Sequence, residues 1–275
     1  MSYNKKLFNF LKKSSTNETI NTEPLKITNV KSKKEEVVVP YNMVVPYLNK
    51  VPLKIFQTWF TKKLPPSMQS TMNNIKKANP EFEHYLYDDE DCHNFIKKNY
   101  SADILEAFDK LIPGAYKADL WRYCVLYFYG GVYIDIKFQC KNNFKLIDLI
   151  DKEYFVSDLE LSGFGIYNGL IIVKQRNEKL LRCINEIVIN TKNNFYGDTF
   201  LHVTGPKLLD TFFKDEEKKN IELNLYLENG LQSIKMKNKN LIILTEYNNY
   251  REEHDKFSNK KHYGILWKNR MIYNL

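Results

Sequence analysis

The sequence predicts an α/β fold built on a sheet of largely parallel strands. Three short, apolar, β-prone segments alternate with helical segments between residues 53 and 138, and this order is typical of a doubly wound half-sheet. Such sheets bind ligands outside the carboxyl ends of their strands. Trp59, Asp88 and Asp135 lie at or near these ends. We therefore expect a ligand site at this edge of the sheet.

The apolar periodicity and the breaks in it place the elements of the first half. Pro65 and Pro66 separate the first strand from the first helix. The acidic run 88–91 is expected to cap the helix that follows it, since it lacks the spacing and glycine of a calcium loop. The expected strands are residues 53–59, 82–87 and 132–138, and the expected helices are residues 67–79, 92–100, 104–111 and 115–129.

The stretch 115–138 is expected to be the centre of the site. Its helical part carries an apolar stripe, while Asp119 and Arg122 share another face one turn apart. A pair of glycines then ends the helix without a Cβ penalty, and the following residues alternate as in a strand. An acid and a base from the helix can thus meet a second such pair, Asp135 and Lys137, near one turn.

The second half of the chain is expected to add further strands and helices. Phe155 and Val156 precede Asp158, and Thr204 is the expected N-cap of a helix that opens at Pro206. The expected strands here are residues 164–173 and 241–244, and the expected helices are residues 178–191 and 204–212.

The chain is expected to divide into a lysine-rich arm and lead-in at residues 1–44 and one domain at 45–275. The arm can form a short basic helix with weak contact to a membrane surface, or remain mobile or loosely docked. The opening residues lack an apolar signal-peptide core, and no apolar run approaches the roughly 18 residues of a spanning helix. Four cysteines without a C-x-x-C pair fit a reducing compartment. We expect a cytoplasmic location, in the host cytoplasm if the protein is viral.

The formal charge of +8 and the pI near 9.0 indicate attraction to phosphates or anionic surfaces. Most basic residues are lysines spread along the chain, and no nucleic-acid reading motif accompanies them. A nucleic-acid partner is therefore not expected.

Two runs in the central stretch, A-D-x-x-R-Y from Ala118 and L-Y-x-Y-G-G-x-Y-x-D ending at Asp135, resemble the sugar-binding "DXD" region of glycosyltransferase family 32. That family includes yeast-type initiating mannosyltransferases and capsular-polysaccharide transferases. Further blocks occur in the family's order, although Phe56 stands where the family usually has His. These blocks are V-P-L-K-I-F-Q-T-W at 51–59, N-G-L-I-I-V-K at 168–174 and V-T-G-P-K-L-L at 203–209.

The resemblance implies a GT-A fold, which is a Rossmann-like nucleotide-sugar-binding domain with a mixed sheet. By position, Asp119 and Arg122 would hydrogen-bond the donor sugar, as a carboxylate–guanidinium pair can, and Asp135 would be the first acid of the D-x-D. Trp59 would stack on the nucleobase. The other donor-binding residues implied are Gln57, Thr58, Asp88, Asn168 and Gly205. The alternatives are a surface ion pair for Asp119 and Arg122 and an ordinary core position for Trp59.

The sequence departs from the family at the second acid, because it reads Asp135-Ile136-Lys137. Two carboxylates would hold Mn²⁺ or Mg²⁺ against the donor diphosphate, whereas the Lys137 ammonium repels a cation and can itself face the diphosphate. His262 resembles the C-terminal histidine that completes the metal site in some GT-A enzymes, and Asp158 is an alternative ligand or acceptor contact. Metal dependence therefore stays open.

We expect a glycosyltransferase that moves a hexose, with retention, from a UDP- or GDP-sugar to a glycan or protein acceptor. The alternative is a catalytically degenerate homologue that binds a sugar nucleotide or a glycan, which Lys137 suggests. Turnover of a donor separates the two.

Overall fold

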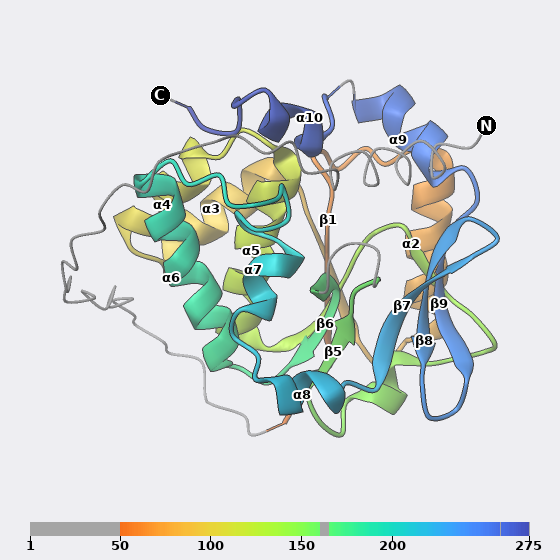
Figure 1. Cartoon of the computed structure of the whole chain (residues 1–275). Helices are drawn as coiled ribbons and strands as arrows, with labels where there is room; N and C mark the ends of the chain where they lie inside the picture. Colours follow the sequence, from red (N-terminus) through yellow and green to blue (C-terminus); the bar gives the residue numbers. More distant parts are fainter. Residues whose placement is uncertain (1–49, 160–164, 259, 275) are drawn as a thin grey trace, which may run out of the picture.

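The computed structural model of the chain describes residues 50–159, 165–258 and 260–274 (Figure 1). The predicted arm at 1–44 and the predicted start of the domain at residue 45 lie outside these residues. Within the described part, nine strands form one mixed sheet in the order β2-β1-β3-β6-β5-β7-β8-β9-β4, and no helix is long and apolar enough to cross a bilayer.

The elements follow one another along the chain as an alternation of strands and helices. The strands are β1 (Lys54–Thr58), β2 (Glu83–Tyr87), β3 (Gly131–Ile134), β4 (Phe138–Cys140), β5 (Tyr154–Ser157), β6 (Ile166–Val173), β7 (Leu223–Glu228), β8 (Leu231–Met236) and β9 (Leu241–Glu246). The helices are α2 (Pro66–Ala78), α3 (Asp89–Asn99), α4 (Ala102–Lys110), α5 (Gly114–Tyr129), the 3-10 helix η1 (Leu146–Leu149), α6 (Glu178–Lys192), α7 (Pro206–Asp210), α8 (Asp215–Lys219), α9 (Tyr250–Ser258) and α10 (Tyr263–Lys268).

The first half of the chain forms a doubly wound, parallel part of the sheet. Strand β1 pairs in parallel with both β2 and β3. Helices α3, α4 and α5 pack on one face of these strands, where Phe56 and Tyr133 point. The other face receives Ile75 of α2 against Ile55 and Val132. The alternation of side chains along each strand therefore distributes its apolar residues between two cores.

The second half makes the sheet mixed. Strand β6 runs antiparallel between β3 and β5, and the β7-β8-β9 meander continues the sheet beyond β5. Figure 1 shows α3 to α7 gathered on one side of the central strands, with α2 and the meander on the other. The predicted α/β fold with a mixed sheet is confirmed. Strands β7 and β8 were not expected from the sequence.

The glycine pair after α5 acts as predicted. Gly130 caps the helix with φ +65° and Gly131 follows with φ +107°, in the region where L-residues with a Cβ are strained. A Cβ on Gly131 would also lie 2.6 Å from the carbonyl oxygen of Lys54 in the adjacent strand. The close β1–β3 pairing below the site therefore requires glycine at this position.

Two local predictions were wrong. The strand expected at 132–138 ends at Ile134, because the N–H of Phe138 donates to the carbonyl of Asp135 and closes a turn. Asp135 and Lys137 therefore lie in a turn. Thr204 does not cap α7, since its hydroxyl donates to a carboxylate and Gly205 takes the N-cap position.

All four cysteines are free, and three of them are buried, as expected for structural thiols.

Candidate active site

A cavity of about 380 Å³ opens at the carboxyl ends of β1 and β3. Its floor comes from the residues after these strands and from β6, and one wall is the first half of α5. The α9–α10 segment supplies the opposite wall, and Figure 1 shows these two helices lying across the end of the sheet. The site therefore lies at the edge that the strand order predicts for a ligand.

Most of the sequence-predicted site residues line this cavity. They are Thr58, Trp59, Asp119, Arg122, Asp135, Lys137, Asp158, Asn168, Gly205 and His262. They come from segments spread over some two hundred residues of sequence, so the fold and not local spacing brings them together. Two predicted residues, Gln57 and Asp88, do not line it.

Arg122 is the centre of a buried charge cluster. Its Nη2 lies 3.4 Å from Oδ1 of Asp119 and its Nη1 lies 3.6 Å from Oδ1 of Asp135. The same Nη1 donates to the carbonyl of Asn168 at 2.7 Å, and the guanidinium stacks 4.2 Å above the ring of Tyr133. Arg122 is only 6% exposed and Asp119 only 7%. The alternative of a surface ion pair is therefore wrong.

Asp119 is fixed by three partners around its carboxylate. The Asn168 Nδ2 donates to Oδ1 at 2.9 Å and the Thr204 hydroxyl donates to Oδ2 at 2.7 Å, while Arg122 supplies the opposite charge. Burial raises the pKa of Asp119, and it outweighs the lowering effect of Arg122 and of the two hydrogen bonds. The carboxylate is thus oriented rigidly toward the cavity before any ligand arrives.

Asp135 is held ionised by its neighbours. The hydroxyl of Tyr133 donates to Oδ1 at 2.9 Å, that of Tyr167 donates to Oδ2 at 3.1 Å, and Lys137 Nζ lies 3.3 Å from Oδ2. Burial favours a higher pKa, but the charges of Lys137 and Arg122 outweigh it and keep the pKa of Asp135 below its ordinary value. Both carboxylate oxygens therefore already have donors.

Lys137 is buried inside an aromatic surround. Its side chain is 8% exposed, and its Nζ lies 5.3 to 5.8 Å from the ring centroids of Phe138, Tyr167 and Tyr250. Cation–π attraction at these distances stabilises a desolvated ammonium. The chain therefore places a fixed positive charge at the position of the second acid in the D-x-D pattern that the central stretch resembles.

The residues at this position do not fit a divalent cation. The Asp135 oxygens accept from two tyrosines, and the Lys137 ammonium is 3.3 Å from one of them, so a cation there would meet like charge at close range. His262 uses its Nδ1 to accept the N–H of Gly264 at 3.1 Å and caps α10. Across residues 50–159, 165–258 and 260–274, no three His, Cys, Asp or Glu side chains are placed to hold a metal ion.

Trp59 both lines the cavity and belongs to the core. It packs with Met68 and Met72 of α2, and its ring lies 4.9 Å from Phe60 and 5.4 Å from His254. Its indole N–H is buried without a hydrogen-bond partner among the described residues. Trp59 can therefore be a core residue and still offer its ring to a nucleobase in the cavity.

Gln57 and Asp88 serve the fold and lie outside the cavity. Gln57 is fully buried, and its Oε1 pairs at 2.7 Å with Nε2 of His84 on the neighbouring strand. Asp88 caps α3: its Oδ1 accepts the N–H of Asp91, whose own carboxylate accepts the N–H of Asp88. The predicted cap is confirmed. The side chain of Gln57 is used by His84 of the neighbouring strand and that of Asp88 by the helix, so neither lines the cavity, and their donor contacts stay predictions.

His84 is expected to make the protein less stable in mild acid. Burial, aided by the charge of Lys76, lowers the pKa of His84 to about 4 from 6.5. The unfolded chain then binds the proton near pH 6.5 and the folded chain only near pH 4, so the free energy of unfolding falls as the pH falls through this window. Urea unfolding should show a smaller fall for His84→Gln than for the wild type. Equal falls in both proteins would assign the effect to other groups.

Several cavity residues were missed by sequence reasoning. Tyr133 stands in the Y-x-D of the central motif and shares the strand face of Asp135, so its spacing was a usable signal. Tyr167 lies just before the N-G-L block. The C-terminal wall gave no comparable pattern, because no element was expected there. Its cavity-lining residues include Tyr250, Arg251, His254, Lys260 and Lys261.

Gly169 is expected to be essential for the geometry of Asp135. A Cβ at this position would lie 2.3 Å from the hydroxyl oxygen of Tyr167 and 2.6 Å from Oδ2 of Asp135. Gly169→Ala should therefore separate the tyrosine from the carboxylate, and it should weaken ligand binding in the cavity while the protein still folds. Isothermal titration with nucleotide sugars measures the loss. Gly165→Ala, whose closest contact would be 3.3 Å, is the matched control, and equal affinities for both variants would contradict this role.

Comparison with known proteins shows that the residues around the cavity are similar in sequence to a sugar-binding region of glycosyltransferases. Residues 65–156 match the model of the glycosyltransferase sugar-binding region containing the DXD motif. The chain is 28% identical over 173 residues to an uncharacterized glycosyltransferase of Acanthamoeba polyphaga mimivirus, a match that covers 62% of this chain and 67% of the viral protein. It is 37% identical over 91 residues to inositol phosphoceramide mannosyltransferase 2 of Schizosaccharomyces pombe, which covers 33% of this chain and 26% of the yeast protein.

Among solved structures, the PaToxG glycosyltransferase is similar with a TM-score of 0.47 and 16% identity, over 59% of this chain and 68% of that one. The matched region contains α5, β3 and the turn with Asp135 and Lys137, so the family match and the charge cluster coincide. The chain is thus similar to glycosyltransferases that contain the DXD sugar-binding region, and residues 65–156 are the part that matches that region.

Proposed function

We propose that the protein transfers a hexose from a nucleotide-sugar donor to an acceptor hydroxyl. The observation that carries this proposal is the buried Asp119–Arg122–Asp135 cluster, which faces the cavity from within the matched sugar-binding region. Sugars present several hydroxyl groups, and a fixed carboxylate beside a fixed guanidinium offers both acceptors and donors to them. Trp59, at the carboxyl end of β1, offers an aromatic surface for the base.

We further propose GDP-mannose as the donor to test first, with UDP-sugars next. The fission-yeast relative is named a mannosyltransferase, and GDP is the usual carrier of mannose. The acceptor in the proposal is a hydroxyl of a glycan or of a glycan-bearing molecule, because the same cavity must admit a second polyhydroxylated group beside the donor sugar.

In this proposal Lys137 supplies the positive charge that a metal ion supplies elsewhere. Its ammonium lines the cavity and is held by Asp135 and three aromatic rings. A charge that is already fixed in a water-poor site stabilises a departing diphosphate without reorganising in the transition state. Transfer would then need no divalent cation.

The reaction balances with the groups named. The bond between the anomeric carbon and the diphosphate oxygen breaks, and its electron pair leaves with the diphosphate. The acceptor oxygen forms a new bond to the anomeric carbon, and its proton passes to the leaving oxygen on the same face of the sugar, so the configuration is retained. Asp119, Arg122 and Asp135 orient the sugar, and Lys137 faces the diphosphate.

Release of free nucleotide from GDP- and UDP-sugars tests the proposal. We expect release in EDTA at a rate that added Mn²⁺ does not raise. Release that requires Mn²⁺ would refute metal independence but retain the transferase. No release from any donor, combined with a thermal shift by one of them, would favour the second candidate, a sugar-nucleotide-binding homologue without turnover, which the missing second acid suggests.

A further inference from the structure

We propose that the face formed by α10, the residues after it and the end of α4 binds the surface of an anionic lipid bilayer. We call it the basic–apolar face. Its apolar part is Ile112, Ile265 and Met271, which are 39%, 47% and 49% exposed. These are among the most exposed large apolar side chains of the described residues, and exposed apolar groups gathered in one place indicate an interaction surface.

Backbone hydrogen bonds bring these three residues together. The N–H of Ile112 donates to the carbonyl of Ile272 at 2.9 Å, which sets Ile112 beside Met271. The N–H of Met271 donates to the carbonyl of Leu266 at 2.8 Å, which brings the chain back against α10 next to Ile265. The three side chains therefore belong to one surface although they come from two distant parts of the sequence.

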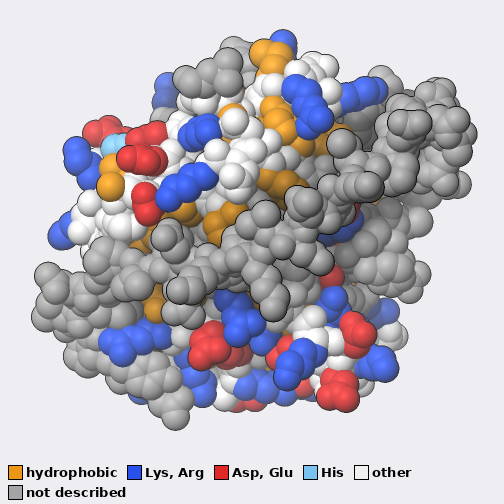
Figure 2. All heavy atoms as spheres, turned by 60° about the vertical axis from the view of Figure 1, so that its left-hand side comes forward, with side chains coloured by type: hydrophobic (Ala, Val, Ile, Leu, Met, Phe, Trp, Pro, Cys, Tyr) orange, Lys and Arg blue, Asp and Glu red, His pale blue; other side chains and the backbone are white. Residues whose placement is uncertain are grey.

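Basic side chains surround this apolar group. On α10, Lys268 follows Ile265 by three residues and shares its helix face, and Arg270 precedes Met271. Lys110 Nζ lies over the ring of Tyr273. Tyr273 forms an antiparallel backbone bridge with Leu111, so Lys110 lies close to Ile112. Figure 2 shows blue and orange side chains interspersed on the upper part of the molecule, where Figure 1 places α10.

The face continues to the mouth of the cavity. Lys260 and Lys261 are exposed and also line the cavity, and Lys260 reaches toward Gly114 at the start of α5. Three acids lie near, Asp89 beside Lys260, Asp109 beside His93, and Asp255 at the cavity mouth near His262. Five cations against three acids leave the face positive, so it is complementary to an anionic surface.

A bilayer fits this combination better than the chain's own N-terminal residues do. Residues 1–49 contain eight lysines and four glutamates and no other charged side chain, so they are themselves basic and would be repelled by the face. A headgroup layer offers negative charge at the level of Lys268 and Arg270 and an apolar layer just beneath for Ile265 and Met271. Binding would turn the cavity mouth toward lipid.

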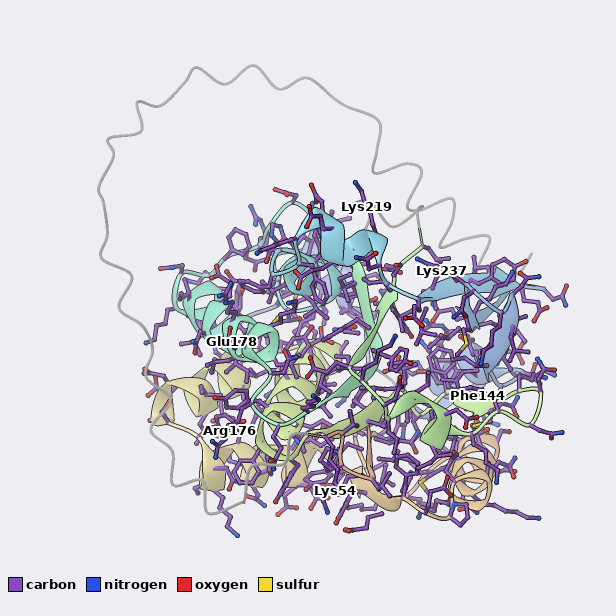
Figure 3. All side chains as sticks on the ribbon, turned by 90° about the horizontal axis from the view of Figure 1, so that it is seen from below. Lys54, Phe144, Arg176, Glu178, Lys219 and Lys237 are labelled. Carbon is purple, nitrogen blue, oxygen red and sulfur yellow. The ribbon has the colours of Figure 1, made fainter. Side chains whose placement is uncertain are left out.

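The proposal is independent of the transfer reaction and is tested on the full chain with flotation of vesicles. One set is pure phosphatidylcholine and the other is phosphatidylcholine and phosphatidylserine in equal parts. We compare the wild type with Lys268→Glu/Arg270→Glu and with Ile265→Ser/Met271→Ser. The matched control is Lys219→Glu/Lys237→Glu, which changes the net charge equally on the opposite side of the molecule, where Figure 3 shows both lysines.

We expect the wild type and the control to float with the anionic vesicles only. Each basic residue near an anionic surface contributes about 1 kcal/mol, so the α10 charge variant, which reverses two of them, should bind at least about 30-fold more weakly. The apolar variant should also bind more weakly, and its remaining binding should disappear at high salt. Equal loss in the control would indicate unspecific charge attraction and overturn the proposal, as would full binding by the two face variants.

Two further results would also overturn it. One is loss of binding when the lysines of residues 1–49 alone are neutralised. The other is failure of the wild type to float with either set. Nucleotide release from donor sugars, measured on the same proteins, should not change in the two face variants or in the control, because none of the residues that they substitute lines the cavity. A protein that floats but releases no nucleotide would keep this inference and refute the proposed reaction.

Discussion

Replacing Arg122 with methionine is expected to destabilise the protein by about 3–5 kcal/mol and to abolish donor binding. The guanidinium is the common partner of Asp119 and Asp135, and all three side chains lie within the cluster at separations of 3.4 to 3.6 Å. Without it, the buried carboxylate of Asp119 loses its cationic partner and Asp135 keeps only Lys137. The carbonyl of Asn168 would also lose its donor.

Urea unfolding measures this loss, with the shift in midpoint converted through an unchanged slope. The control is Arg182→Met on the exposed face of α6, which should change the free energy of unfolding by less than about 0.5 kcal/mol. Adding Asp119→Asn to Arg122→Met removes the carboxylate that loses its cationic partner and should recover part of the loss, since Asp135 keeps Lys137. If Arg122→Met were as stable as the control variant, the cluster would not have the role assigned to it.

The second large effect is expected at Lys137. In EDTA, Lys137→Ala should lower nucleotide release by about 10²–10³-fold, which is the usual cost of removing one preorganised charge-stabilising group. Lys137→Asp should be equally inactive in EDTA. It should regain activity in Mn²⁺, because it places a second carboxylate two residues after Asp135, in the pattern that binds a hard cation.

The comparison of Lys137→Asp with Lys137→Ala shows whether activity in Mn²⁺ comes from the new carboxylate or only from the loss of the ammonium. A gain in Mn²⁺ by Lys137→Asp and not by Lys137→Ala assigns the gain to the new carboxylate. Lys137→Ala with wild-type release in EDTA would show that the ammonium has no part in supporting the diphosphate. Circular dichroism and thermal unfolding of both variants check that the fold is retained, since each also leaves Asp135 without its neighbour at 3.3 Å.

The sequence by itself determined the parallel half of the sheet and the centre of the site. The helices and strands between residues 53 and 138 follow from apolar periodicity, proline breaks and the glycine pair at 130 and 131. Each of these signals acts between residues that are close in sequence. The same local logic placed Asp119 and Arg122 one turn apart and identified the acidic cap of α3.

Only the tertiary structure decided how those residues are used. The carboxylate of Asp135 accepts the hydroxyl of Tyr167, which lies more than thirty residues later. The surround of Lys137 includes Tyr250 from the last quarter of the chain. The hydrogen bonds of Gln57, and those of Thr204, whose predicted cap was wrong, are likewise made with partners on other elements. Burial and pairing across such distances leave no periodic trace in the sequence, because they arise when the strands and helices pack together.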